Sequence, residues 1–289
     1  MQKIADIGEI LPLFDGFFFD AYGVLVNERE LLPGVSALFK RLKNKNLPHL
    51  VLSNGSARTL EKTIDKYRSL GLDLASDQVL TSGSILEQVL PDLFSPNTKI
   101  VVLGTRDSVE LVEKAGMSVT HINQMNAIPE EVEVVVIANQ TEFDFLSSVN
   151  AVVDWLWNAL RDERSVKVVL SNPDYVYPRS GNSIGITAGS VASILEASIS
   201  ALLGISSENW LIRTGKPEPF LFREGKTRLG CKKPVMFGDQ IVTDILGAKR
   251  SNMSAVLMTT GLVSEKFIVN FPKEHRPDYI LDSFQGASC

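Results

Sequence analysis

Short apolar runs alternate with amphipathic stretches along almost the whole chain. The first apolar runs have the length and composition of buried strands, and they lie at Phe17–Phe19, Leu50–Leu52 and Val79–Thr81. After Pro33, apolar side chains recur three and four residues apart from Val35 to Leu42, as on one face of a helix. The stretch from Leu60 to Tyr67 has a similar spacing. This alternation predicts a parallel sheet with helices on both faces.

Between residues 82 and 181 the same pattern repeats on a smaller scale. Strands are expected at Ile100–Leu103, Val132–Ala138 and Val166–Leu170, and helices at Arg106–Ala115 and Asp144–Leu160. We interpret this block as a separate α/β domain that is inserted into the first one.

The pattern of the first domain resumes near Ser183. A helix is expected from Gly189 to about Leu203, and later strands at Trp210–Ile212, Val235–Phe237, Ala255–Met258 and Tyr279–Leu281. The expected division is therefore a core made of residues 1–81 and 182–289, with residues 82–181 as the inserted domain.

Polar residues follow two of the expected core strands. Asp20 comes directly after Phe17–Phe19, and Ser53, Asn54 and Gly55 come after Leu50–Leu52. Open α/β sheets bind their ligands at the carboxyl ends of the strands, so these side chains are candidates for a common site. Hydroxyl, amide and backbone N–H groups before a helix can also bind an anion.

Acidic and basic side chains later in the chain complete a possible site. Asp239 and Asp244 follow the strand Val235–Phe237, and with Asp20 they would form a cluster of oxygen ligands that suits Mg²⁺. Carboxylates in one pocket repel one another unless a cation neutralises them. Lys216, beside Pro217, offers a compact positive charge. Taken singly, each of these residues also fits a structural role, such as a helix cap, a turn or a surface lysine.

Taken in order, the motifs resemble those of the haloacid dehalogenase (HAD) superfamily. An aspartate, a serine, a lysine and an acidic pair follow one another in that order at Asp20, Ser53, Lys216, Asp239 and Asp244. The expected insertion between the serine and the lysine resembles the caps of subfamily IIA, the NagD-like and p-nitrophenylphosphatase-like branch. So do the runs Ser171–Asp174, Ala188–Ser190, Gly215–Pro219 and Pro277–Tyr279. The resemblance implies a Rossmann-like, doubly wound parallel sheet with an inserted α/β cap of type C2.

The resemblance also implies an activity and the residues that carry it. Most members are Mg²⁺-dependent phosphatases that work through an aspartyl-phosphate, here on Asp20, with a small phosphorylated metabolite as substrate. The implied roles are Asp20 and Lys216 for catalysis, Ser53, Asn54 and Gly55 for the phosphoryl group, and Asp20, the backbone carbonyl of Tyr22, Asp239 and Asp244 for the metal. In the cap, Asn172, Asp174 and Arg179 are implied to reach the substrate.

Tyr22 departs from the phosphatase pattern. The phosphatases usually have Asp-x-Asp in the first motif, and the second Asp acts as general acid and base, a role that typically contributes ~10²–10⁴-fold in rate. A phenol, with an ordinary pKa near 10, is a poor base at neutral pH. Haloacid dehalogenases have Asp-x-Tyr-Gly, as in Asp20 to Gly23. Three interpretations stay open: a slow or selective phosphatase, a C–halogen hydrolase, and a phosphate-ligand binding protein with impaired catalysis.

Composition limits the class of protein. The 289 residues are 44% hydrophobic and 22% charged, which is ordinary for a globular protein and enough for two modest domains. The net charge of −5, without a dense Lys/Arg cluster, argues against nucleic acid as a partner. No uncharged apolar run approaches the roughly 18 residues of a membrane span, and two cysteines suggest a reducing compartment, so we expect a cytoplasmic protein. Caps of this type often mediate dimers, and the resemblance leaves a homodimer open.

Overall fold

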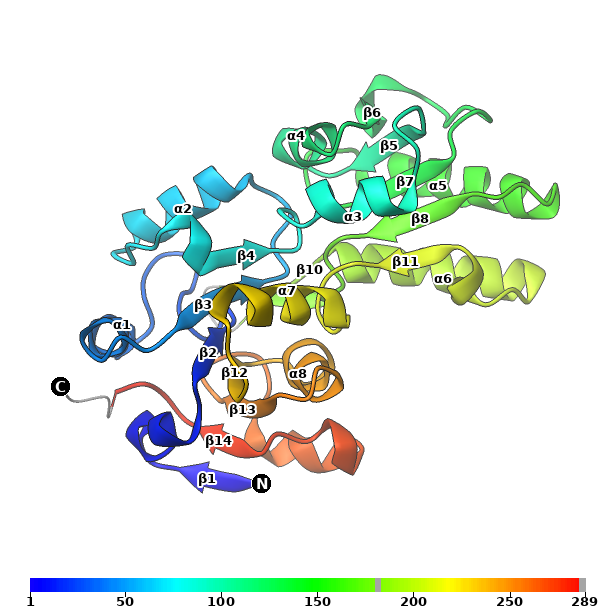
Figure 1. The fold of residues 1–289 in the computed structure, drawn as a ribbon. Coiled ribbons are helices and arrows are strands. Elements are labelled where there is room, and N and C mark those ends of the chain that lie inside the picture. The colour runs from blue at the N-terminus through cyan, green and yellow to red at the C-terminus, as the bar shows by residue number, and fades with distance from the viewer. Residues whose placement is uncertain (180–182, 286–289) are drawn as a thin grey trace.

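Seven parallel strands form the larger of two main sheets in the computed structural model, which describes residues 1–179 and 183–285. The order is β1-β14-β13-β12-β2-β3-β4 (Figure 1). Its strands are β1 (Gln2–Ile4), β2 (Gly16–Phe19), β3 (His49–Ser53), β4 (Val79–Thr81), β12 (Pro234–Gly238), β13 (Ser254–Met258) and β14 (Tyr279–Leu281). The expected boundary between residues 181 and 182 and the second cysteine, Cys289, fall outside the described residues.

Helices cover both faces of this sheet because alternate side chains of its strands point to opposite faces. Phe17 and Phe19 of β2 pack into a cluster with helices α1 (Val35–Asn44) and α2 (Leu60–Ser69). Phe18, between them, packs on the other side with α7 (Pro219–Leu229) and α8 (Leu246–Arg250). All three phenylalanines are fully buried. The doubly wound parallel core expected from the sequence is confirmed.

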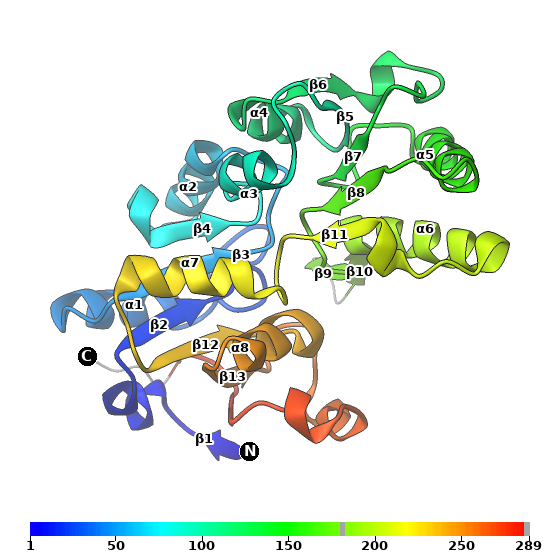
Figure 2. The same cartoon turned by 45° about the vertical axis from the view of Figure 1, so that its right-hand side comes forward.

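The second sheet is smaller and also parallel, with the order β11-β8-β7-β5-β6. Its strands are β5 (Lys99–Leu103), β6 (Ser118–His121), β7 (Val134–Ile137), β8 (Lys167–Leu170) and β11 (Leu211–Arg213). One face packs against α5 (Phe145–Arg161) and α6 (Ala188–Leu203), and the other against α3 (Leu86–Leu93) and α4 (Arg106–Lys114). An antiparallel pair, β9 (Val176–Arg179) and β10 (Ser183–Ile186), lies beside it (Figure 2). We call this part of the molecule the cap.

Two elements expected in the core belong to the cap. The helix expected from Gly189 to about Leu203 is α6, and it packs against the cap sheet. The run Trp210–Ile212 was expected in the core, but β11 pairs with β8 in the cap sheet, with Leu211 opposite Val168. Trp210 is fully buried in the same cluster as α6. A buried parallel strand has the same apolar composition in either sheet, so its partner is decided by pairing and packing rather than by its own sequence. We therefore propose that the chain returns to the core after Arg213, about thirty residues later than expected.

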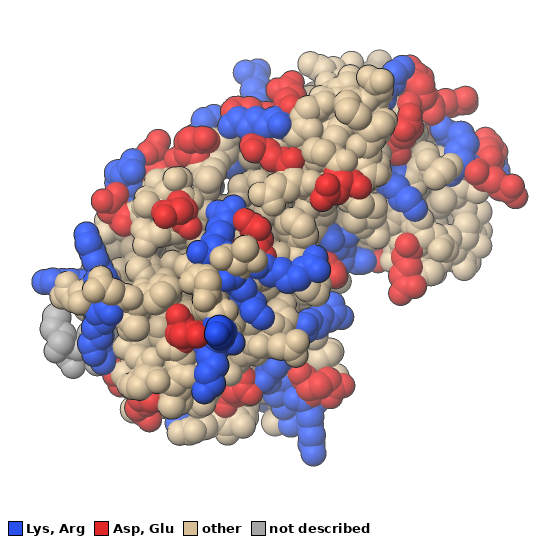
Figure 3. All heavy atoms as spheres, viewed as in Figure 1, with Lys and Arg blue, Asp and Glu red and all other residues tan. Residues whose placement is uncertain are grey.

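Several short elements complete the chain. Short 3₁₀ helices lie at Ile7–Glu9, Leu11–Leu13, Ser76–Gln78, Ile122–Gln124, Ser207–Asn209, Glu265–Asn270 and Lys273–His275, and a π-helical turn lies at Ile241–Ile245. Among the described helices, none is both long and apolar enough to cross a bilayer. On the face drawn in Figure 3, basic and acidic side chains are interspersed rather than gathered by sign.

Candidate active site

Asp20 lies at the carboxyl end of β2, a central strand between β12 and β3. Its backbone N–H donates to the carbonyl of Phe237 at 2.8 Å, which continues the ladder between β2 and β12 by one residue. The residue is 8% exposed. Its carboxylate is therefore held on a rigid strand end at the edge where open α/β sheets bind ligands.

Lys216 reaches this carboxylate from the loop between β11 and α7. Its ammonium donates to Asp20 Oδ1 at 2.5 Å, to Asp244 Oδ1 at 2.7 Å and to the carbonyl of Leu52 at 2.9 Å. These bonds use all three donors of an ammonium group, and the residue is only 1% exposed. Lys216 thus joins two carboxylates from different strand ends.

Asp239 and Asp244 come from the turn after β12. Asp244 Oδ2 accepts from the backbone N–H groups of Asp239 and Gln240, both at 3.1 Å. Asp239 Oδ2 accepts from the N–H of Leu262 at 2.9 Å. The other oxygen, Asp239 Oδ1, is buried and has no hydrogen-bond partner among the described residues. A buried acceptor without a partner is costly, which indicates that something absent from the protein chain binds there.

The carboxylates of Asp20, Asp239 and Asp244 offer oxygen atoms within 4.8 Å of one another. Two glycines enclose this cluster: a Cβ atom at Gly23 or Gly261 would collide with the Asp239 carboxylate. Gly23 also has φ of +87°, a conformation that favours glycine. An all-oxygen donor set with an unpartnered buried oxygen fits a hard divalent cation such as Mg²⁺.

The acidities of these groups reflect their crowding in the metal-free protein. Burial raises the pKa of Asp20 to about 7, although Lys216 opposes the shift. Burial, together with Asp20 and Asp244, raises the pKa of Asp239 well above its usual range. Burial alone would lower the pKa of Lys216, but the carboxylates of Asp20 and Asp244 outweigh it, and the pKa lies above its usual value. A bound cation would favour the ionised carboxylates.

Ser53 is the last residue of β3, Asn54 and Gly55 follow it, and all three line the same site. Asn54 organises its surroundings: Oδ1 accepts from the backbone N–H of Lys216 at 2.7 Å, and Nδ2 donates to the carbonyl of Lys216 at 3.0 Å. The same Nδ2 donates to Asp174 Oδ1 in the cap at 2.8 Å. Ser53 Oγ accepts from the N–H of Gly55 at 3.2 Å, and the Ser53 side chain is also hydrogen-bonded to the Tyr67 phenol.

A cavity of about 830 Å³ opens between core and cap above these residues. Asn172 and Asp174 line it, but Arg179 does not. Arg179 is the last residue of β9 and borders a neighbouring hollow with Gly23 and Thr260. Arg179 therefore does not line the cavity that contains the other expected site residues, and its contact with substrate stays a prediction.

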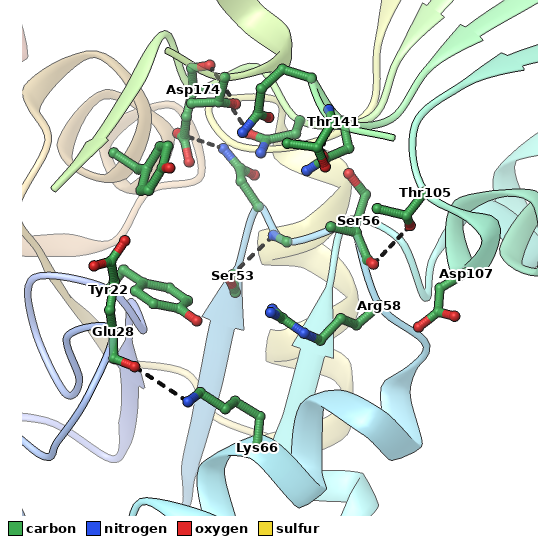
Figure 4. Close-up of a pocket in the computed structure, with 18 of the residues that line it drawn as sticks. Tyr22, Glu28, Ser53, Ser56, Arg58, Lys66, Thr105, Asp107, Thr141 and Asp174 are labelled. Carbon is green, nitrogen blue, oxygen red and sulfur yellow. Dashed lines mark hydrogen bonds between the residues drawn. The ribbon is translucent and has the colours of Figure 1, made fainter. Parts of the chain in front are cut away.

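Tyr22 lines the cavity, and Figure 4 shows its phenol ring directed into it. Figure 4 also shows Arg58 with its guanidinium extended into the same space. No sequence pattern singles out the basic side chains of this rim, which are Arg58, Lys62, Lys66 and Arg106. Lys62 and Lys66 lie on α2 and Arg58 lies two residues before it, whereas Arg106 is the first residue of α4 in the cap, so the docking of the cap adds Arg106 to the rim. A helical basic residue has no signal that distinguishes a cavity rim from ordinary surface.

Two segments of the sequence match families of known proteins. Residues 17–118 match the family described as haloacid dehalogenase-like hydrolase, and residues 213–287 match the one described as HAD-hydrolase-like. The chain belongs to the HAD hydrolases. The matched segments contain Asp20 and Ser53 in the first case, and Lys216, Asp239 and Asp244 in the second.

Similar proteins align with this chain over nearly its whole length. The chain is 26% identical to the dihydroxyacetone phosphatase of Corynebacterium glutamicum over 276 residues, 94% of this chain and 90% of that protein. A structure described as a possible sugar phosphatase of the HAD superfamily, from Cytophaga hutchinsonii, superposes with a TM-score of 0.82 at 26% identity and covers 98% of this chain and 99% of that one.

A second similar structure is that of a glycerol phosphate phosphatase. This protein, from Mycobacterium tuberculosis and in complex with magnesium, has a TM-score of 0.74 at 18% identity and covers 95% of this chain and 76% of that one. At that identity the likeness concerns the fold alone. The combination of core and cap agrees with the NagD-like branch of the HAD hydrolases.

Proposed function

We propose that this HAD hydrolase is a Mg²⁺-dependent phosphatase of a small phosphorylated metabolite, with Asp20 as the nucleophile. The observation that carries the proposal is the bridge from Asp20 Oδ1 through Lys216 Nζ to Asp244, beside the unpartnered oxygen of Asp239. The similar proteins named dihydroxyacetone phosphatase and acid sugar phosphatase support the substrate class.

The chain's own residues account for the first chemical step. An oxygen of Asp20 attacks phosphorus, the bond from phosphorus to the leaving oxygen breaks, and the phosphoryl group becomes an acyl phosphate on Asp20. Lys216 fixes the direction of the carboxylate, and the Ser53 hydroxyl can donate to a phosphoryl oxygen. Phosphoryl transfer depends mainly on such positioning and on charge stabilisation.

The metal has a defined place in this proposal. Asp20 and Asp239 would hold Mg²⁺, with Asp244 and the carbonyl of Tyr22 as the further ligands that the family resemblance implies. When bound, the ion neutralises the negative charge of the phosphoryl group. Asp244 already accepts hydrogen bonds at both oxygens, so we expect it to contribute less directly than Asp239.

Turnover of p-nitrophenyl phosphate and of a panel of phosphorylated sugars and polyols tests the proposal. We expect hydrolysis that requires Mg²⁺, stops with EDTA and is absent from Asp20→Asn. A purified, folded protein without metal-dependent turnover on any of these substrates would contradict it, and tight binding of a phosphorylated ligand without product would then favour the binding protein.

Tyr22 motivates the second candidate, a C–halogen hydrolase. In that reaction Asp20 would attack carbon and release halide, with no use for the metal-type cluster of Asp239 and Asp244. Chloride release from 2-chloropropionate in the presence of EDTA would establish it. We rank it below the phosphatase because it leaves the buried Asp239 oxygen unexplained.

The proposal extends to location and assembly. A chain of 289 residues with two cysteines suits a reducing compartment, and we propose the cytoplasm. We also propose that the protein can form a homodimer through its cap, as the family resemblance implies. Fluorescent tagging and light scattering of the purified protein test these two points separately.

A further inference from the structure

The site as described has a nucleophile but no group for proton transfer. Tyr22 occupies the position where most phosphatases of this superfamily place their second aspartate, and a phenol is a poor base at neutral pH. An alkyl phosphate nevertheless needs a proton for its leaving oxygen, and the acyl phosphate needs a base that activates water. Among the cavity-lining residues, another carboxylate is the most direct substitute.

Asp174 is such a carboxylate, and its backbone is firmly positioned. It lies in the cap loop between β8 and β9 and lines the cavity that also contains Asp20 and Tyr22. Its N–H donates to Asn172 Oδ1 at 3.0 Å. Its carbonyl accepts from the N–H of Gly189 at 3.0 Å and from the Thr187 hydroxyl at 3.2 Å.

The loop that carries Asp174 is packed directly on the loop that carries Lys216. At Gly215, a Cβ atom would come within 2.5 Å of Pro173 Cδ and 2.6 Å of Asn54 Oδ1, so the two loops meet there without room for a side chain. Asn54 then links the catalytic lysine to the cap, because its amide binds both the Lys216 backbone and Asp174 Oδ1. Asn54 thus connects Asp174 to Lys216 through hydrogen bonds to both residues.

The electrostatic surroundings suit proton exchange near neutral pH. Burial raises the pKa of Asp174 to about 6, while Lys216 opposes and Asp244 adds to the shift. Asp174 in turn contributes to the raised pKa of Asp20. A general acid and base works best when its pKa is close to the working pH.

We propose that Asp174, supplied by the cap, is the general acid and base of this phosphatase in place of the aspartate that Tyr22 replaces. The inference rests on the proposed function. In the first step, the protonated Asp174 carboxyl gives its proton to the leaving oxygen as the bond between that oxygen and phosphorus breaks. In the second step, the Asp174 carboxylate takes a proton from the water that attacks phosphorus. The bond from phosphorus to Asp20 then breaks, inorganic phosphate leaves, and Asp174 is protonated again.

The competing explanation is that Asp174 only fastens the cap to Asn54. The variant Asp174→Asn separates the two roles, because an asparagine keeps an oxygen that can accept from Asn54 Nδ2 but cannot exchange a proton. Asp92→Asn, at an exposed position on α3, is the matched control. Thermal unfolding of both variants shows whether the fold is intact.

Two substrates distinguish the protonation of the leaving oxygen from the attack of water on the acyl phosphate. Glycerol phosphate has a poor leaving group that needs the acid, and we expect Asp174→Asn to slow its turnover by roughly 10²–10⁴-fold. p-Nitrophenyl phosphate has a good leaving group, so the first step should survive and the second should be slow. We then expect a burst of one p-nitrophenolate per active site, followed by slow turnover. Asp174→Glu should recover part of the rate, and Tyr22→Asp should restore turnover in the Asp174→Asn background.

The outcomes separate this inference from the proposed function. If the unmodified protein shows no Mg²⁺-dependent turnover, the proposed function itself fails. If it is active and Asp174→Asn is within about threefold of it on glycerol phosphate, only the role of Asp174 is overturned. Equal losses on both substrates without a burst would also overturn it, because that is the result expected of a purely structural contact.

Discussion

Asn54 and Lys216, 162 residues apart in the chain, are joined by two hydrogen bonds between the amide of one and the backbone of the other. The side chain of Asn54 therefore binds the backbone N–H and the backbone carbonyl of Lys216. These two bonds hold the Lys216 backbone in place and so determine where the Lys216 ammonium enters the site. Both residues are at most 2% exposed, so water cannot replace these bonds. Because Lys216 binds the Asp20 carboxylate, the direction of that carboxylate depends on this pair as well as on strand β2.

Replacing Asn54 by aspartate should loosen this arrangement. Asn54→Asp keeps the acceptor for the Lys216 N–H but places an oxygen against the Lys216 carbonyl and the Asp174 carboxylate. We expect the free energy of unfolding to fall by about 2–4 kcal/mol and kcat to fall by up to about 10²-fold. Urea titration and steady-state kinetics measure the two effects. Asn150→Asp, on the exposed face of α5, should change neither, and an equal effect there would contradict this account.

Removing the charge of Lys216 should destabilise the metal-free protein. Lys216→Met leaves Asp20 and Asp244 without their shared partner in a buried site. Breaking a buried ion pair from one side costs about 3–5 kcal/mol, and we expect a loss of that order by urea titration in EDTA. Mg²⁺ should recover part of it by neutralising the same carboxylates. Lys232→Met at an exposed position is the control, and an unchanged stability of Lys216→Met would be incompatible with the bridge.

Glycine at position 23 should matter for the metal rather than for the fold alone. Gly23 and Gly116 have similar left-handed backbones, with φ of +87° and +78°, but only at Gly23 would a Cβ atom meet the Asp239 carboxylate. Both alanine variants should lose about 1 kcal/mol of stability from backbone strain. Only Gly23→Ala should raise the Mg²⁺ concentration for half-maximal activity, by roughly 10–100-fold. Equal metal affinities in the two variants would show that Asp239 does not hold the ion.

The effect of Mg²⁺ on stability should depend on pH. The pKa of Asp20, about 7 in the folded metal-free protein, lies above its unfolded value, so the folded state binds more protons between about pH 4 and 7. The contribution of this group to stability is therefore present at low pH and is lost as the pH rises through 7. Mg²⁺ binds the ionised form and offsets that loss. We expect the rise in thermal midpoint on adding Mg²⁺ to be larger at pH 8 than at pH 5.5, and the reverse order would refute the assignment of Asp20 as a ligand.

The strand ends of the core were predictable from the sequence. Asp20 follows three consecutive phenylalanines that are buried on both faces of the sheet, and such a run has few alternatives to a central strand. Asp239 follows a similar run in β12. Because the strands are parallel, their carboxyl ends meet at one edge, and the cluster of Asp20, Asp239 and Asp244 follows from that rule.

Contacts between core and cap were not predictable in the same way. The bond of Asn54 to Asp174, and the place of Arg106 on the rim that also includes Arg58, depend on how two separately packed units meet. The same limit explains the misplaced strand Leu211–Arg213, whose apolar pattern fits either sheet. Hydrophobic periodicity indicates that a segment is buried but does not specify which buried neighbour it will have.

The central claim is that Asp20 forms a covalent bond to phosphorus with the help of Lys216 and a divalent ion. The most direct measurement is mass spectrometry of the protein quenched in acid during turnover of a phosphorylated substrate with Mg²⁺. We predict the added mass of one phosphoryl group on the peptide that contains Asp20, absent in EDTA and in Asp20→Asn. Active protein that carries no such adduct under any quench time, or an adduct that persists in Asp20→Asn, would contradict the account.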